Sequence, residues 1–246
     1  MPHPAGHVRS GRSREGATPH DAAPCDEIDV AFLDYLADSS TRAVLTRQTL
    51  EHVVLVVVPL LIALVLSLGL GVTAHRAARL RAPILSVVSG LLTIPSLALF
   101  ALLLPVVGIG DQATFVALTL YALLPIVRNT VAGLGGVDPA IVEAARGMGM
   151  SPTTRLWRIE LPSAWPVILA GIRVSTLMIT GIAAIAAVVG GSGLGREIFR
   201  GIRRIGSEGA LESLLGGTLA IVLLALLFDL FYLGLGRLTI SRGLRD

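Results

Sequence analysis

The sequence predicts an all-α, polytopic membrane protein that crosses the bilayer about five times. Hydrophobic residues make up 53% of the 246 residues, and the charged 15% leave long uncharged runs between them. Aromatic residues contribute only 4%, so the apolar content is mostly aliphatic, which favours helices in lipid over a β-barrel with aromatic girdles. One span needs about 20 apolar residues, so a chain of this length has room for about five or six.

The first part of the chain is polar. Residues 1–27 are rich in Pro, Gly, Ser, His and Arg and lack the apolar run of a signal peptide, so they predict a disordered extension. Its His residues have no compact spacing and the lone Cys25 has no disulfide partner, so no metal centre is expected. Residues 28–52 predict short amphipathic helices at the membrane surface. A transmembrane domain follows at 53–238, with a short tail at 239–246.

Five charge-poor runs predict the spans of the transmembrane domain. They cover about residues 53–73, 83–110, 112–127, 165–189 and 214–236. In the second run, Gly90, Pro95 and Pro105 are expected to kink or break the helix, because Pro lacks the backbone N–H and crowds the preceding turn.

Two ionisable residues fall inside the last two spans. Arg173 lies near the start of the fourth span, where its long side chain is expected to reach the membrane surface. Asp229 lies within the fifth span, where a carboxylate is costly in lipid, so it is expected to face the protein interior or water. A functional role and a structural hydrogen bond both remain open for Asp229.

A polar helical segment, residues 138–162, separates the third span from the fourth. Asp138 followed by Pro139 predicts a helix start, because the carboxylate can cap a free N–H and Pro loses no donor there. Gly149 is expected at a corner, because a positive φ is cheap only for Gly. Ser151 followed by Pro152 repeats the cap-plus-Pro signal and predicts the start of a second helix. The Leu-Pro pair at 161–162 is predicted to end that second helix. Helices this short bury no core of their own, so their apolar stripe is expected to pack on another protein: Ile141, Ala144, Ala145 and Met148.

The same segment carries a family motif. Its fixed positions resemble the EAA–G–I–LP spacing of permease subunits in binding-protein-dependent ABC importers: Glu143, Ala144, Ala145, Gly149, Ile159, Leu161 and Pro162. The resemblance implies that these residues dock on a separate ATPase subunit in the cytoplasm, with Glu143 offering a carboxylate to it. Arginines are spread almost evenly over the two sides of the predicted topology, so the orientation rests on this resemblance.

The second and third spans resemble a narrower group. Thr-Ile-Pro-Ser at 93–96, Gly-Ile-Gly at 108–110 and Leu-Pro-Ile-Val-Arg-Asn-Thr at 124–130 are similar to permeases of osmoprotectant importers for glycine betaine, carnitine, choline or proline betaine. Methionine-importer permeases share the five-span fold and the docking segment, so methionine is the alternative solute. The resemblance implies a pathway beside the interrupted helices, with these candidate residues: Pro95, Ser96, Asn129 and Asp229.

The implied function is import of an osmoprotectant through the cytoplasmic (inner) membrane of a bacterium by alternating access. The sequence contains no Lys and therefore no Walker A lysine, so ATP and Mg are expected on a partner ATPase, and the permease is expected to be no enzyme and to hold no cofactor. The other expected partners are an extracytoplasmic solute-binding protein, a second permease subunit of the same or another chain, and membrane lipid, with no nucleic acid.

Two features bear on the alternatives. A secondary transporter would predict inverted repeats and several intramembrane ionisable residues, and the sequence shows neither. The Gly-rich run at 190–195 lacks G-x-G-x-x-G spacing, so it is expected to be a tight turn at the outer end of the fourth span rather than a phosphate loop.

Overall fold

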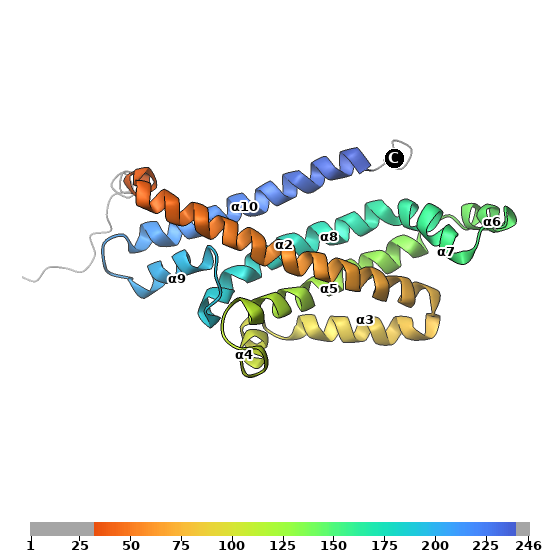
Figure 1. Ribbon diagram of the computed structural model, residues 1–246, viewed down its shortest axis with the longest axis horizontal. Helices are drawn as coiled ribbons and strands as arrows, with labels where there is room; N and C mark the ends of the chain where they lie inside the picture. Colours follow the sequence, from red (N-terminus) through yellow and green to blue (C-terminus); the bar gives the residue numbers. More distant parts are fainter. Residues whose placement is uncertain (1–31, 240–246) are drawn as a thin grey trace, which may run out of the picture.

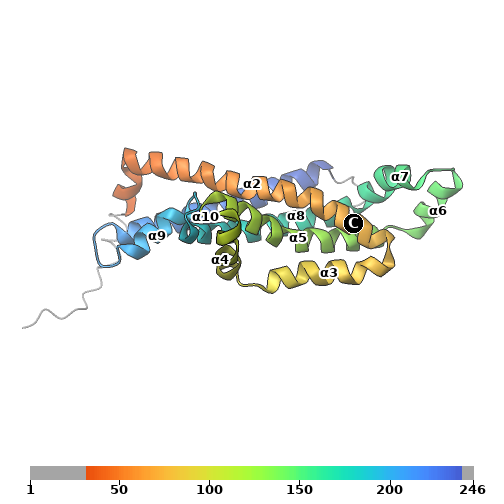
Figure 2. The ribbon, with the colours of Figure 1, turned by 60° about the horizontal axis from the view of Figure 1, so that its bottom comes forward.

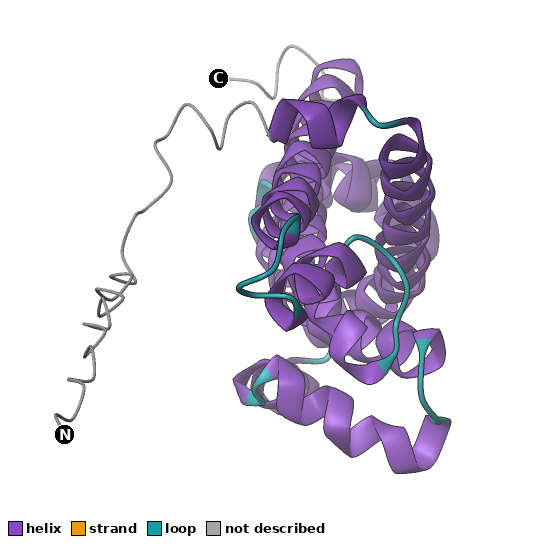
Figure 3. Ribbon diagram, turned by 90° about the vertical axis from the view of Figure 1, so that its left-hand side faces the viewer, coloured by secondary structure: helices purple, strands orange, loops and turns teal. Residues whose placement is uncertain are grey.

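The computed structural model describes residues 32–239, which form an elongated bundle of helices (Figure 1). The predicted extension at 1–27, Cys25 and most of the predicted C-terminal tail lie outside the described residues. Within the described range every regular element is helical, as the view along the bundle also shows (Figure 3), so the all-α prediction is confirmed. Four of these helices are long and apolar enough to cross a membrane, and a bent pair makes five if it counts as one span.

The first long helix is α2, Ser39–Arg76, which follows a short helical stretch at residues 32–37. Asp38 caps it by accepting a hydrogen bond from the Thr41 backbone N–H at 2.9 Å. At 1.5 Å per residue, its 38 residues extend for about 57 Å, well beyond a hydrocarbon core of about 30 Å. A boundary between a surface segment and the first span was expected at 52–53. The helix runs through this point without a break, because no Gly or Pro precedes Pro59 in α2.

The second predicted span is two helices, α3 (Ala78–Thr93) and α4 (Ser96–Val107), which are bent by 98°. The break falls at Ile94 and Pro95, both in extended conformations, because a following Pro disfavours the helical region for the residue before it. Gly90 and Pro105 lie inside helices, so only one of the three expected break points ends a helix.

The centre of the bundle is α5, Asp111–Gly135, which packs between α2 and the later helix α8 (Leu161–Ala183). Of its most apolar stretch, 61% is buried, against 17% in the last helix, so α5 is the core and the last helix lies at the edge. The helix does not end at 127, where the predicted span ends. Arg128 projects outward, where it donates to the Ser89 hydroxyl at 3.3 Å, and the helix continues to Gly135.

The predicted end at 161–162 is also wrong. After α6 (Pro139–Gly147) and α7 (Pro152–Arg155), a π-helical turn at Leu156–Glu160 leads directly into α8. In that wider turn the Leu161 N–H donates to the carbonyl oxygen of Leu156, five residues back. A π turn relieves the clash between a Pro ring and the carbonyl four residues earlier, so Pro162 fits into a continuing helix.

The remaining elements complete the two ends of the bundle. A 3-10 turn at Ala184–Val189 follows α8, and α9 (Gly195–Arg203) leads to α10 (Ala210–Thr239). The start of α2, α9 and the start of α10 meet at one end, whereas α6 and α7 lie together at the other (Figures 1 and 2). There the Trp165 indole N–H donates to the Thr239 hydroxyl at 2.9 Å, which joins the start of α8 to the end of α10.

Candidate functional site

The first candidate site is the corner between α6 and α7. Both predicted helix caps form: the Asp138 carboxylate accepts from the Ala140 N–H at 2.8 Å, and the Ser151 hydroxyl accepts from the Thr154 N–H at 3.2 Å. Gly149 has a φ of 76°, in the left-handed region, as its position predicted. Capping at both helices and the left-handed residue between them set the angle of the corner.

The outward face of this corner is apolar and uncovered. Ile141 is 47% exposed, Met148 70% and Trp157 66%. Ala144 is exposed as well, whereas Ala145 is buried against the rest of the chain, so the predicted stripe divides between the two sides of α6. Trp157 was not among the residues expected here, although a lone Trp between Arg155 and Arg158 is a signal that the sequence offers.

The inner side of the corner is polar and tightly held. A hollow of about 370 Å³ separates α6 from the bundle, and its charged lining includes Arg76, Glu143 and Arg146. The Arg155 Nε lies 2.7 Å from Oε1 of the buried Glu160, and Arg76 donates to the Pro152 carbonyl oxygen at 2.6 Å. α7 is therefore tied to the end of α2 and to the π turn.

The predicted docking residues separate into two groups. Glu143 and Ala144 are both exposed residues of α6; Glu143 lines the hollow described above and makes no hydrogen bond or ion pair with any described residue. Ile159, Leu161 and Pro162 lie in the π turn and at the start of α8, with Leu161 packed against the core. The second group is the connection between the corner and the membrane span.

The predicted pathway candidates are not brought together. Pro95 and Ser96 lie at the bend between α3 and α4, where the Tyr121 hydroxyl donates to the Ile94 carbonyl oxygen at 2.7 Å. Asn129 lies on α5, and its side-chain amide donates to the Pro125 carbonyl oxygen at 2.8 Å. Asp229 lies on α10 and has a different partner.

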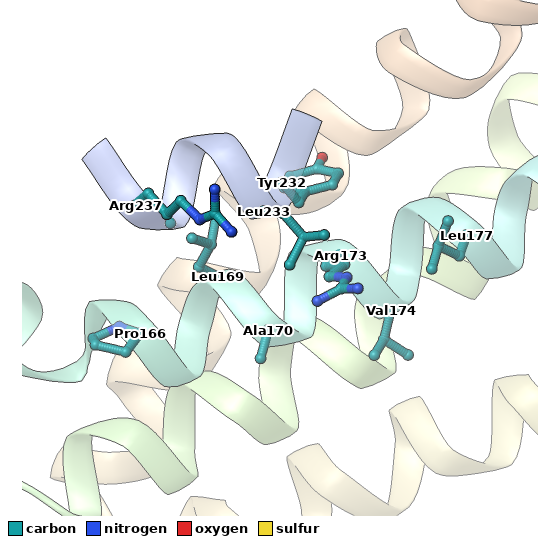
Figure 4. A pocket seen from close by; sticks show the side chains of 10 residues that line it. Pro166, Leu169, Ala170, Arg173, Val174, Leu177, Tyr232, Leu233 and Arg237 are labelled. Carbon is teal, nitrogen blue, oxygen red and sulfur yellow. The ribbon is translucent and has the colours of Figure 1, made fainter. Parts of the chain in front are cut away.

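That partner is Arg173 on α8. Its Nε donates to Oδ1 of Asp229 at 2.6 Å and its Nη2 to Oδ2 at 2.8 Å, so the pair is bidentate. The expectation that Arg173 reaches the membrane surface is therefore wrong, because a carboxylate on the neighbouring helix is close enough to hold it. Arg173 also lines a hollow between α8 and α10, shown in Figure 4.

The Gly-rich run at residues 190–195 is a turn held in place by two carboxylates, and is called the clamped turn below. The Asp111 carboxylate accepts from the Ser192 N–H at 2.7 Å and from its hydroxyl at 3.0 Å, and Glu51 accepts from the Gly193 N–H at 3.2 Å. Gly193 has a φ of 90°, and a Cβ on Gly195 would overlap the Ala184 carbonyl oxygen. The expected tight turn with close packing is present, and it joins α2 and α5 to the 3-10 turn that follows α8.

A buried carboxylate near this turn was missed at the level of sequence. Glu197 on α9 is 1% exposed and accepts from the Tyr35 hydroxyl at 3.0 Å, from the Gln48 amide at 3.3 Å and from Arg200 at 2.6 Å. Burial, together with the charge of Glu197 and the hydrogen bond to it, raises the pKa of Tyr35 to about 12. Tyr35, Gln48 and Arg200 lie 162, 149 and 3 residues from Glu197 along the sequence. The first two could therefore not be recognised as its partners from local sequence.

Comparison with known proteins identifies relatives of the whole membrane domain. Residues 63–240 match the family described as binding-protein-dependent transport system inner membrane component. The choline transport system permease protein OpuBB of Bacillus subtilis is 36% identical over 185 residues, covering 75% of this chain and 83% of that protein. The osmoprotectant import permease protein OsmW of Salmonella typhimurium is 41% identical over 202 residues, covering 80% of this chain and 91% of that protein.

The fold is also found among solved structures. A structure of the MetNI methionine ABC transporter in an inward-facing conformation superposes with a TM-score of 0.74 at 23% identity, covering 83% of this chain and all of that one. It has the fold expected from the docking segment and the five-span plan. The family match extends over most of the described bundle, from within α2 to the end of α10. The chain therefore belongs to the family of binding-protein-dependent transport system inner membrane components.

Proposed function

We propose that this chain is the membrane-spanning permease subunit of an ATP-driven importer for an osmoprotectant such as glycine betaine, choline or carnitine. Family membership and the names of OpuBB and OsmW support this solute class. The sequence motifs of the second and third predicted spans support it as well. Membership of the family of binding-protein-dependent transport system inner membrane components favours this assignment over a secondary transporter.

The observation that carries the proposal is the uncovered face of the α6–α7 corner. Ile141, Met148 and Trp157 expose apolar side chains at the end of the bundle where the predicted ATPase would lie. Large exposed apolar side chains gathered at one end of a protein are typical of a protein interface. The carboxylate of Glu143, which lines the hollow on the inner side of the corner and has no partner among the described residues, can accept a hydrogen bond or pair with a cation of the ATPase.

The connection between this corner and the membrane gives the mechanism. α7, the π turn and α8 form one continuous helical unit from Pro152 to Val189, so a push on the corner reaches the span without a flexible linker. When a pair of ATPase subunits closes on ATP, the corners of two permeases are drawn together, and their α8 helices tilt to open the pore to the outside. Transport then follows the alternating-access scheme, in which ATP shifts the population between two states.

The proposed assembly contains three kinds of component. Two permeases, identical or different, form the pore in the cytoplasmic membrane of a bacterium. Two ATPase subunits bind ATP and Mg, and an extracytoplasmic binding protein delivers the solute to the outer end. The clamped turn at 190–195 and α9 are the elements that this chain presents at that outer end.

Uptake by the reconstituted complex tests the proposed solute. The permease, its ATPase and its binding protein are placed in proteoliposomes, and uptake of labelled glycine betaine, choline, carnitine and methionine is measured with ATP inside. We expect uptake of at least one of the first three and none with an ATPase that lacks its Walker A lysine. Methionine uptake that excess betaine, choline and carnitine fail to reduce would assign the chain to a methionine importer.

Docking is tested separately with matched charge insertions. Met148→Glu places a carboxylate on the exposed corner, and Ile205→Glu places one on the equally exposed connection before α10 at the other end of the bundle; the two side chains are 70% and 77% exposed. We expect Met148→Glu to reduce co-purification of the ATPase at least tenfold and Ile205→Glu to leave it unchanged. Equal co-purification for both variants would show that the ATPase does not bind this corner.

A further inference from the structure

The ion pair between Arg173 and Asp229 lies deep in the membrane. Arg173 follows Trp165 by eight residues and Asp229 precedes Thr239 by ten, and Trp165 and Thr239 are joined at the cytoplasmic end. At 1.5 Å per residue, the pair is about 12 to 15 Å from that contact. With that contact taken as the cytoplasmic edge of a hydrocarbon core about 30 Å thick, the pair lies near the middle of the core.

The pair is not enclosed by this chain. The Arg173 side chain is 38% exposed and the Asp229 side chain 24%. Charged groups at the centre of a bilayer are costly against lipid and almost always face water or protein. The exposed edge of the pair therefore faces a water-filled space or another subunit, rather than acyl chains.

A hollow of suitable size opens beside the pair. It has a volume of about 610 Å³ and lies between α8 and α10, with Arg173, Tyr232 and Leu233 among its lining (Figure 4). Ligand pockets are commonly about 300 to 1,000 Å³, so the hollow has room for a small solute. The Tyr232 hydroxyl is held by the Thr176 hydroxyl at 2.9 Å, which fixes the ring at the edge of the hollow.

We propose that Arg173 and Asp229 form a solute-contacting point of the translocation pathway, and that it suits a zwitterion with one cationic and one carboxylate group. This inference rests on the proposed function and names the chemistry of its pathway. Separating an ion pair within the membrane leaves two uncompensated charges, which is strongly unfavourable. A zwitterion replaces both partners at once, because its carboxylate binds the guanidinium while its cation binds Asp229.

The same balance of charge predicts discrimination among solutes. A solute that carries only a cation can replace Arg173 at Asp229, but it leaves the guanidinium without an anion. Glycine betaine, which has both charges, is therefore favoured at this point over choline, which has one. Loss of the guanidinium should penalise the zwitterion and spare the cation.

Uptake ratios in proteoliposomes that contain the ATPase and the binding protein test this discrimination. Both solutes are supplied at concentrations that saturate the binding protein. Differences in the uptake ratio between variants then arise in the permease. We expect Arg173→Gln to lower the ratio of glycine betaine to choline uptake about tenfold. Arg173→Lys, which keeps the charge, should retain most of the ratio. The matched control is Arg47→Gln, which removes the guanidinium of the exposed Arg47–Glu51 pair on α2 and should leave the ratio unchanged. An equal loss of both solutes in Arg173→Gln would show that the pair is only a link between helices.

A labelling experiment leaves the ion pair intact. In a Cys25→Ser background, Leu233→Cys places a thiol in the lining of the hollow, and Leu230→Cys places one on the exposed side of α10 outside that lining. We expect a charged, water-soluble thiol reagent to label position 233, glycine betaine to slow that labelling, and position 230 to stay unlabelled. No labelling at 233 would mean that lipid or a second subunit fills the hollow, and the inference would fail.

The two proposals fail in different ways. An assembled wild-type complex that hydrolyses ATP but takes up none of the betaine, choline and carnitine solutes overturns the proposed function and this inference with it. Wild-type uptake with an unchanged solute ratio in Arg173→Gln overturns only the inference.

Discussion

Replacement of Gly149 is the sharpest test of the α6–α7 corner, because the chain supplies its own control two residues away. A Cβ added to Gly149 would have no neighbour within 4 Å, and the same is true of Gly147. The two positions differ in backbone conformation: Gly149 has a φ of 76°, whereas Gly147 lies in α6. Any difference between Ala substitutions at the two sites therefore reports the cost of the left-handed backbone and not a steric clash.

The expected magnitude follows from that difference. A left-handed conformation costs an L-residue about 1 to 2 kcal/mol, and a β-branched residue more. A cost of this size reduces the population of the native corner by a factor of about 5 to 30. At Gly147 the sign reverses, because Ala in a helix is more favourable than Gly by about 0.5 to 1 kcal/mol.

Coupling between ATP hydrolysis and transport is the appropriate assay. In the reconstituted complex, Gly149→Ala should lower solute-stimulated ATP hydrolysis and uptake severalfold, Gly149→Val should lower them further, and Gly147→Ala should match or exceed the wild type. Glu143→Ala, which removes a solvent-exposed carboxylate, should weaken ATPase association less than Gly149→Val does. Wild-type association and transport by a folded, inserted Gly149→Val variant would refute the coupling role of the corner.

Three further predictions concern the rest of the chain. Cysteines introduced at Ser207 should react with an impermeant reagent applied from outside, whereas those at Ala140 or Arg79 should not, and the reverse pattern would invert the topology. Gly195→Ala should prevent stable insertion, because its Cβ would overlap the Ala184 carbonyl oxygen, whereas Gly181→Ala has open space and should express normally. Tyr35 should contribute to stability fully below pH 10 and lose that contribution as pH rises toward 12, because folding raises its pKa from 10.0 to about 12. Alkaline unfolding of wild type and Tyr35→Phe should therefore diverge in that range, and superimposable curves would mean that Tyr35 is not buried against Glu197.

Much of this protein could be predicted from the sequence because the relevant forces are local. Long uncharged runs require helices in lipid, where every backbone polar group must be satisfied within the segment, so the all-α class follows from composition. Caps at Asp138 and Ser151 and the left-handed Gly149 depend on neighbours within a few residues, and all three were predicted correctly. The exposed apolar face of α6 follows from its periodicity and its short length.

Only the tertiary structure could decide features that depend on distant partners. From the sequence, Arg173 and Asp229 were considered separately, and the Arg173 side chain was expected at the membrane surface. The two residues are 56 positions apart, so their pairing becomes evident only when α8 and α10 pack together. For the same reason, the hydrogen bonds from Tyr35 to the Glu197 carboxylate and from Ser192 to the Asp111 carboxylate were not predicted. The continuation of the helix through Pro162 depends on a π turn, a small change in backbone pitch that composition does not encode. Local sequence determines which segments become helices, and packing between segments determines which charged groups meet inside the membrane.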